Sequence, residues 1–69
     1  MDDEELLQLI QQLDELKLEH RDLDDAIRLM VEQTTYINQL QLTRMKKRKL
    51  YLKDTISRLE SKLIPDMNA

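Results

Sequence analysis

The chain contains no cysteine, glycine, tryptophan or phenylalanine, and it has one proline and two tyrosines. Without cysteine it can form neither a disulfide nor a zinc site with thiolate ligands. Without glycine it has no glycine-rich phosphate-binding loop and lacks the turn residue that β-hairpins commonly use. Because aromatic side chains dominate most globular cores, their scarcity also disfavours a conventional globular domain. These absences leave long helices as the simplest structure.

Long apolar runs are missing as well. Apolar residues never occur more than three in succession, whereas about 20 are needed for a helix to cross a bilayer. The chain opens with Asp2, Asp3, Glu4 and Glu5, the reverse of the positively charged start of a signal peptide. We therefore expect no membrane segment, no role at a membrane surface, and a cytoplasmic protein.

The residues that are present favour helices that associate. Charged residues make up 36% of the 69 positions, and leucine and glutamine are abundant, as in coiled coils. The charge is uneven, because residues 1–35 carry a net charge of −8 and residues 36–69 a net charge of +5. A chain this short buries too little surface to be comfortably stable alone, so we expect one small domain with a partner copy.

Two series of residues follow the alternating spacing of three and four that marks a coiled-coil seam. They comprise Leu6, Leu9, Leu13, Leu16, His20, Leu23, Ile27 and Met30, and then Leu42, Met45, Lys49, Leu52, Ile56, Leu59 and Leu63. Continuing the first series would require position 41, whereas the second begins at 42. One long parallel coiled coil would therefore have to rotate its apolar stripe, whereas a turn between two helices removes the conflict.

Local signals place the ends of these helices. Asn38 is a good N-cap, Gln41 completes a capping box, and Ile37 and Leu42 occupy the positions of a hydrophobic staple. Pro65 ends the second helix, since the residue before a proline avoids the α region. The predicted segments are a helix at about 3–33, a turn at about 34–38, a helix at about 39–64 and a tail at 65–69.

An antiparallel register fits both series. Facing Met30 with Leu42 gives residue numbers that add up to 72, and the same sum faces His20 with Leu52. Half of that sum is residue 36, so the register places the turn at Tyr36, in agreement with the capping signals. The predicted fold is an all-α, antiparallel two-helix coiled-coil hairpin.

This register sets the basic run 44–49 against the acidic run 20–25. Ion pairs such as Asp24 with Lys46 are expected beside the seam, each contributing at most about 1 kcal/mol when exposed. Their larger effect is to favour the antiparallel arrangement over arrangements that bring like charges together.

The basic stretch 44–53 has a second interpretation, because lysine and arginine neutralise nucleic-acid phosphates. The neighbouring acids and the net charge of −3 disfavour it, and Tyr51 alone offers little stacking surface. An acidic partner is a further alternative. The residues expected to face a partner on the outer side of the second helix are Lys47, Arg48, Lys53 and Asp54.

His20 and Lys49 are the polar members of the seam, and the register puts them in adjacent layers. His20 could act as a pH switch or as a metal ligand, although the chain has no second histidine and further ligands would come from another copy. The simpler interpretation, which we favour, is a polar layer that fixes the register, with the Lys49 amine reaching outward. Asp24 and Lys46 belong to the same polar step.

No catalytic arrangement is visible. The carboxylates fall on solvated helix faces, no nucleophile motif is present, and Ser57 and Ser61 have no base at a suitable spacing. We expect a protein that is not an enzyme and uses no cofactor, metal or small-molecule substrate.

Two segments resemble the YdcH-like family of small bacterial proteins, over a region from about Leu6 to the end. His20 to Asp24 reads His-x-x-Leu-Asp, and residues 45–54 match Leu-Lys-Lys-x-Lys-Leu-x-Leu-Lys-Asp with Met45 in place of the first Leu. The resemblance implies a bacterial, cytoplasmic helical hairpin and supplies no activity or catalytic residue. It marks His20, Asp24, Lys47, Lys53 and Asp54 as motif positions.

Nine apolar residues fall outside the predicted seam, which suggests a second interface. They are Leu7, Ile10, Leu18, Leu29, Val31, Leu40, Leu50, Tyr51 and Ile64. We therefore expect a homodimer of hairpins that forms an antiparallel four-helix bundle. The two function classes that remain are a structural or adaptor module that binds proteins, and a nucleic-acid-associated protein that uses residues 44–53.

Overall fold

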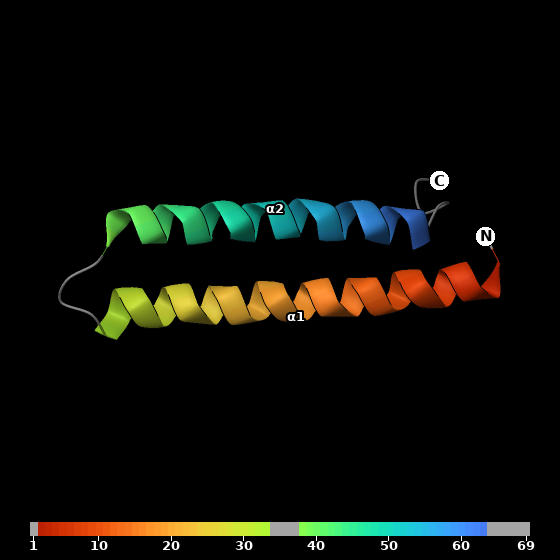
Figure 1. The fold of residues 1–69 in the computed structure, drawn as a ribbon, viewed down its shortest axis with the longest axis horizontal. Helices are drawn as coiled ribbons and strands as arrows, with labels where there is room; N and C mark the ends of the chain where they lie inside the picture. The colour runs from red at the N-terminus through yellow and green to blue at the C-terminus, as the bar shows by residue number, and fades with distance from the viewer. Residues whose placement is uncertain (1, 34–37, 64–69) are drawn as a thin grey trace.

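The computed structural model describes residues 2–33 and 38–63, which form two helices side by side (Figure 1). Helix α1 spans Asp3–Gln33, and helix α2 runs back along it over Gln39–Leu63. The predicted all-α antiparallel hairpin is therefore confirmed. The predicted positions of the turn residues Tyr36 and Ile37, of Ile64, and of Pro65 with the tail 65–69 lie outside the described residues.

Both helices begin with a side-chain cap. The Asp2 carboxylate accepts a hydrogen bond from the backbone N–H of Glu5 at 2.8 Å, which satisfies one of the free donors of the first turn of α1. The Asn38 side-chain oxygen accepts a bond from the N–H of Gln41 at 3.1 Å, so Asn38 caps α2. Acidic residues in the first turn of α1 also complement its helix dipole.

The two helices meet along the predicted seam. Its five buried residues are Leu13, Ile27, Leu42, Leu52 and Leu59. Leu52 lies near the middle of α2 and is 0% exposed. Every other predicted seam member except Leu6 is half-buried, so the heptad pattern identified the contact surface of both helices.

Leu6 is the exception, since it is 39% exposed although it was predicted to lie in the seam. The cause is the difference in length between the helices, 31 residues in α1 and 25 in α2. In the register of the seam, Leu63 at the end of α2 is level with Leu9. Leu6 therefore extends past the last turn of α2, and no residue of that helix covers it.

The contact between two helices buries one stripe of each and leaves the opposite faces uncovered. No residue outside the seam is buried among those that the structure describes. Neither α1 nor α2 contains a stretch long and apolar enough to cross a bilayer. The hairpin is thus held by a narrow apolar core with two large outer surfaces.

We predict that Leu52→Ala destabilises the hairpin by about 2–4 kcal/mol, because it removes methyl groups from a fully enclosed site and leaves a cavity. Urea unfolding followed by circular dichroism measures this change. Leu50→Ala is the matched control, since Leu50 lies two residues away on the same helix and is 65% exposed. Equal losses in the two variants would contradict the assignment of Leu52 as the centre of the core.

Candidate functional site

Three ion pairs join the helices beside the seam. Two of them lie on one flank, where Lys17 Nζ is 3.3 Å from Glu60 and the Lys49 amine bonds the Asp24 carboxylate. The third lies on the other flank, where the Arg48 guanidinium is 3.0 Å from Glu19. The Asp24–Lys49 pair joins the acidic run 20–25 to the basic run 44–49, as predicted, and Glu19 beside the acidic run pairs with Arg48.

Asp24 pairs with Lys49, and not with Lys46 as expected. Residues on a flank lie to one side of the seam, so two flank residues that face each other have a different sum of residue numbers from two seam residues. Lys17 and Glu60 add up to 77, whereas facing seam residues add up to 72. By that register Asp24 is level with Lys53, one turn beyond Lys49, and Lys46 is too far toward the turn. Lys46 is exposed and makes no ion pair with any described residue.

The bond to Lys49 affects the titration of Asp24. The ammonium of Lys49 donates a hydrogen bond to this carboxylate and attracts its negative charge, and together these effects hold the pKa of Asp24 below its ordinary value of 3.8. Arg28 and His20 contribute weaker effects in the same direction. Asp24 is therefore ionised at neutral pH and stabilises the polar layer as an anion.

His20 lies in the seam, half-buried, next to this ion pair. Its Nε2 atom is buried, and no described protein group hydrogen-bonds it. The side chain borders a groove of about 550 Å³ along the flank. The groove is lined by Lys17, His20, Asp24, Lys49, Lys53, Ile56, Ser57 and Glu60. Among the residues described, no three His, Cys, Asp or Glu side chains are grouped as metal ligands.

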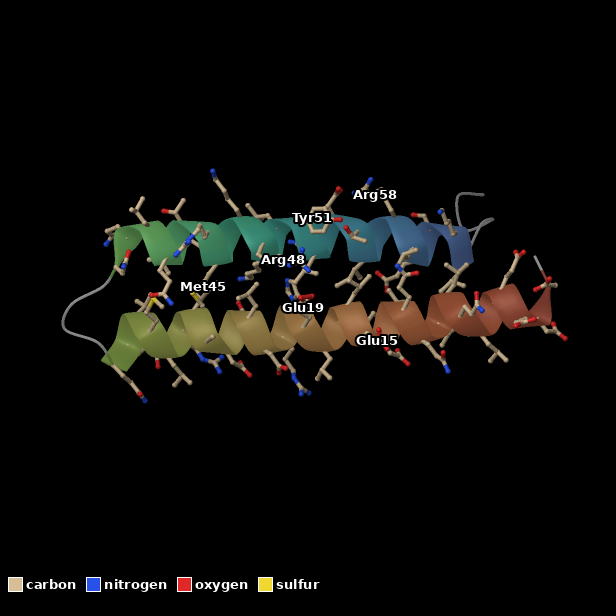
Figure 2. All side chains as sticks on the ribbon, in the orientation of Figure 1. Glu15, Glu19, Met45, Arg48, Tyr51 and Arg58 are labelled. Atoms are coloured by element: carbon tan, nitrogen blue, oxygen red, sulfur yellow. The ribbon has the colours of Figure 1, made fainter. Side chains whose placement is uncertain are left out.

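The opposite flank carries an arrangement that the sequence reasoning missed. Arg48 bonds both carboxylate oxygens of Glu19, at 3.0 and 3.1 Å, and its guanidinium carbon lies 5.3 Å from the centre of the Tyr51 ring. Figure 2 shows Glu19 and Arg48 pointing toward each other between the helices, with Tyr51 beside them on α2. Arg48 was expected to have charge to spare for a partner, and the structure shows that Glu19 already neutralises it.

A register signal could have identified this pair. Glu19 and Arg48 occupy the flank positions just before a seam residue of their own helix, namely His20 and Lys49. In an antiparallel pair such positions face each other, in the same way as the Lys17 and Glu60 positions on the other flank. Each flank therefore has a register of its own, in which Glu19 and Arg48 add up to 67 and Lys17 and Glu60 to 77.

The other predicted partner-binding residues divide into two groups. Asp54 is bonded within α2, since its carboxylate lies 2.8 Å from Arg58. Lys47 and Lys53 are exposed and make no ion pair with the residues that the structure describes. Lys53 borders the groove near His20, whereas Lys47 projects from the far side of α2. Both lysines thus keep an uncompensated charge at the surface.

Exposed apolar side chains accompany these charges outside the seam, most of them on the outer faces, with Ile10 and Val31 on the flank that carries Lys17. Eight of the nine apolar residues predicted to lie outside the seam are described, and all eight are 40–78% exposed. They are Leu7, Ile10, Leu18, Leu29, Val31, Leu40, Leu50 and Tyr51. The candidate functional surface is therefore the pair of outer helix faces, since the inner faces are taken up by the seam.

We predict that Asp24→Asn lowers the unfolding temperature at pH 7 by removing the bond to Lys49. Because the pKa of Asp24 is depressed in the folded protein, its stabilising contribution is present above 3.8 and is lost as the pH falls through the folded-state pKa. Thermal unfolding of both proteins should converge as the pH is lowered below that value. Asp22→Asn is the control, since its carboxylate lies 3.8 Å from Arg21 of the same helix, and an equal loss there would contradict the prediction.

We predict that His20→Leu stabilises the hairpin by about 1–2 kcal/mol, because a buried nitrogen without a protein partner is replaced by an apolar group. Urea unfolding at pH 7.5 provides the measurement. His20→Ala serves as the comparison and should destabilise, since it leaves a gap in the seam. A His20→Leu protein no more stable than wild type would show that Nε2 is not a cost to folding.

Comparison with known proteins identifies the family of this chain. No curated protein and no solved structure matches the chain. The model of a family described as a protein of unknown function, DUF465, matches residues 13–60. That region holds the three interhelical ion pairs and all five buried seam residues. Since the match covers more than half of the chain, this protein belongs to the DUF465 family.

Proposed function

We propose that this protein is a non-enzymatic interaction module that binds other proteins through the outer faces of its two helices. The observation that carries the proposal is the exposure of eight large apolar side chains away from the seam. Isolated apolar residues are normal at a protein surface, but this chain of 69 residues exposes eight large ones outside its seam. Covering them would gain about 25 cal/mol for each Å² of apolar surface removed from water.

The charges of the two helices add selectivity to such binding. Residues 3–33 of α1 carry ten acids and three bases, a net charge of −7, and residues 39–63 of α2 carry two acids and eight bases, a net charge of +6. A partner that meets the outer face of one helix therefore encounters a net charge, which is negative on α1 and positive on α2. Complementary charge speeds association and excludes partners of the wrong sign.

The groove beside His20 supports binding better than catalysis. It is a surface groove whose lysines and carboxylates largely neutralise one another, as the Lys17–Glu60 and Lys49–Asp24 pairs show. A catalytic acid or base would need a pKa tuned toward neutrality, and Lys49 moves the pKa of Asp24 in the opposite direction. We therefore assign no enzymatic role to it.

Nucleic-acid binding through residues 44–53 is the second candidate. Arg44, Lys46, Lys47 and Lys53 favour it, because none of them makes an ion pair within the described part of the chain. Glu19 and Asp24 oppose it, since they occupy Arg48 and Lys49 and place negative charge beside any phosphate. We rank it below protein binding.

The resemblance to the YdcH-like family extends the proposal to the kind of organism and the cellular compartment. All five motif residues lie on the two helices of the hairpin that the resemblance implies, and family membership at the level of DUF465 is compatible with it; they are His20, Asp24, Lys47, Lys53 and Asp54. On that basis we propose a bacterial protein that acts in the cytoplasm.

Affinity capture from the cells that express the protein tests the proposed function. The tagged chain should retain specific proteins after nuclease treatment, and mass spectrometry should identify them. A bait with Leu29, Leu40 and Leu50 changed to Gln should retain roughly tenfold less, because loss of buried apolar contacts at this scale costs more than 1.4 kcal/mol. Glutamine is a good helix former, and circular dichroism checks that the bait stays folded.

A bait with Ser61→Gln is the matched control, since it alters an exposed position of α2 without removing an apolar side chain. Capture that disappears on nuclease treatment, and that falls steeply with salt, would favour the nucleic-acid alternative. Capture of no protein by the wild-type bait, together with no self-association, would overturn the proposed function.

A further inference from the structure

Two short stripes of residues lie on the outer faces of the hairpin, one on each helix. On α1 the stripe consists of Leu18, Asp22, Asp25 and Leu29; on α2 it consists of Leu40, Arg44, Lys47 and Tyr51. We call them the α1 outer stripe and the α2 outer stripe. Both have the spacing four, three, four, which keeps a stripe on one side of a helix, and each lies about 150° around its helix from the seam at about 100° per residue.

The two stripes match each other when they are read in opposite directions. Leu18 then faces Tyr51, Asp22 faces Lys47, Asp25 faces Arg44 and Leu29 faces Leu40, and the residue numbers of every pair add up to 69. The inner two pairs join opposite charges, and the outer two join apolar side chains. A contact between these stripes would differ from a coiled-coil seam, whose core positions are apolar, because its two central pairs are charged and only its ends are apolar.

The apolar ends of the stripes are open to solvent. Leu18 is 50% exposed and Leu29 48%, and on α2 Leu40 is 78% and Tyr51 55% exposed. These four account for nearly half of the nine large apolar side chains that the described surface exposes. The Tyr51 ring lies 5.3 Å from the guanidinium carbon of Arg48, which is itself bonded to Glu19.

The charges at the centre of the stripes are available to a partner as well. Arg44 and Lys47 make no ion pair with any residue that the structure describes. Asp22 has only the loose contact of 3.8 Å with Arg21, whereas Asp25 is bonded to Arg28 at 2.8 Å. Asp22 and Lys47 are therefore the charged residues of the stripes that would gain most from an ion pair with a second copy.

We propose that the α1 outer stripe of one copy of this protein binds the α2 outer stripe of a second copy, with the two helices antiparallel. This inference rests on the proposed function and names the partner as a second copy of the chain. Within one hairpin the stripes cannot meet, because each faces away from the seam and so away from the other helix. The complementarity can be satisfied only between molecules.

The position of the stripes determines the form of the assembly. Since they lie on opposite sides of the hairpin, the contact joins different surfaces of the two copies and leaves one stripe free at each end. Copies therefore add head to tail, and the assembly is not a closed four-helix bundle of two hairpins. The same register would place Glu15 opposite Asp54, next to the Leu18–Tyr51 end of the stripes. Arg58 is bonded to Asp54 at 2.8 Å and would offset the repulsion between these two acids.

Sedimentation velocity of the full chain over a concentration series tests the assembly. The weight-average molecular mass of the wild-type protein should rise with concentration and exceed that of two chains of 8.3 kDa each. Added salt should shift this rise to higher protein concentration, because it screens the charged pairs at the centre of the stripes. A wild-type protein that stays monomeric throughout, or that stops at a closed dimer, would overturn the inference.

Charge reversal identifies the surfaces in contact. Lys47→Glu and Asp22→Lys should each weaken self-association by roughly tenfold or more, because each places like charges opposite one another. An equimolar mixture of the two variants should associate again. The α2 outer stripe of Lys47→Glu then faces the α1 outer stripe of Asp22→Lys, and the two substituted positions carry opposite charges. Variants that associate like wild type, or a mixture that fails to recover, would contradict the pairing.

Leu18→Gln and Leu7→Gln form the matched pair for the apolar contacts. Both residues are exposed leucines of α1, at 50% and 61%, but only Leu18 belongs to the stripe. Leu18→Gln should weaken association, and Leu7→Gln should leave it unchanged; equal effects would count against the stripes. If any of these results excludes self-association through the stripes, capture of another protein by the wild-type bait would still support the proposed function.

Discussion

The contact between two apolar stripes along the seam is the interaction on which the rest of this hairpin depends. Leu52 at its centre is fully enclosed, and Leu13, Ile27, Leu42 and Leu59 are buried around it. Hydrophobic burial along the seam stabilises the hairpin more than the ion pairs beside it, because those pairs are partly or fully exposed and each contributes at most about 1 kcal/mol. The seam also sets the register, and the register decides which charges meet.

The polar flanks refine what the seam determines. On one flank Lys17 pairs with Glu60 and Asp24 with Lys49; on the other, Glu19 pairs with Arg48. All three bonds link an acidic position to a basic one across the helices, and a parallel or shifted arrangement would break them. These pairs therefore contribute more to the choice of one arrangement than to its total stability.

A contact between only two described helices also explains why apolar side chains are exposed on their outer faces. Within residues 2–33 and 38–63 each helix has one neighbour, so no described element covers the face opposite the seam and its apolar residues are exposed (Figure 1). In a larger bundle the same leucines would lie in a core. Here they lie among charges whose sum is negative on α1 and positive on α2, and the proposed binding would use these faces.

The sequence by itself determined the helical class, the N-cap at Asn38, the seam and the antiparallel register, because heptad spacing and capping chemistry are local properties of the chain. Only the tertiary structure decided that Asp24 bonds Lys49, that Arg48 is held by Glu19 against Tyr51, and that Leu6 extends past α2. The physical reason is that flank pairing depends on the offset between the helices and on the reach of long side chains. The length of α2 beside α1 likewise fixes which residues have a neighbour to cover them.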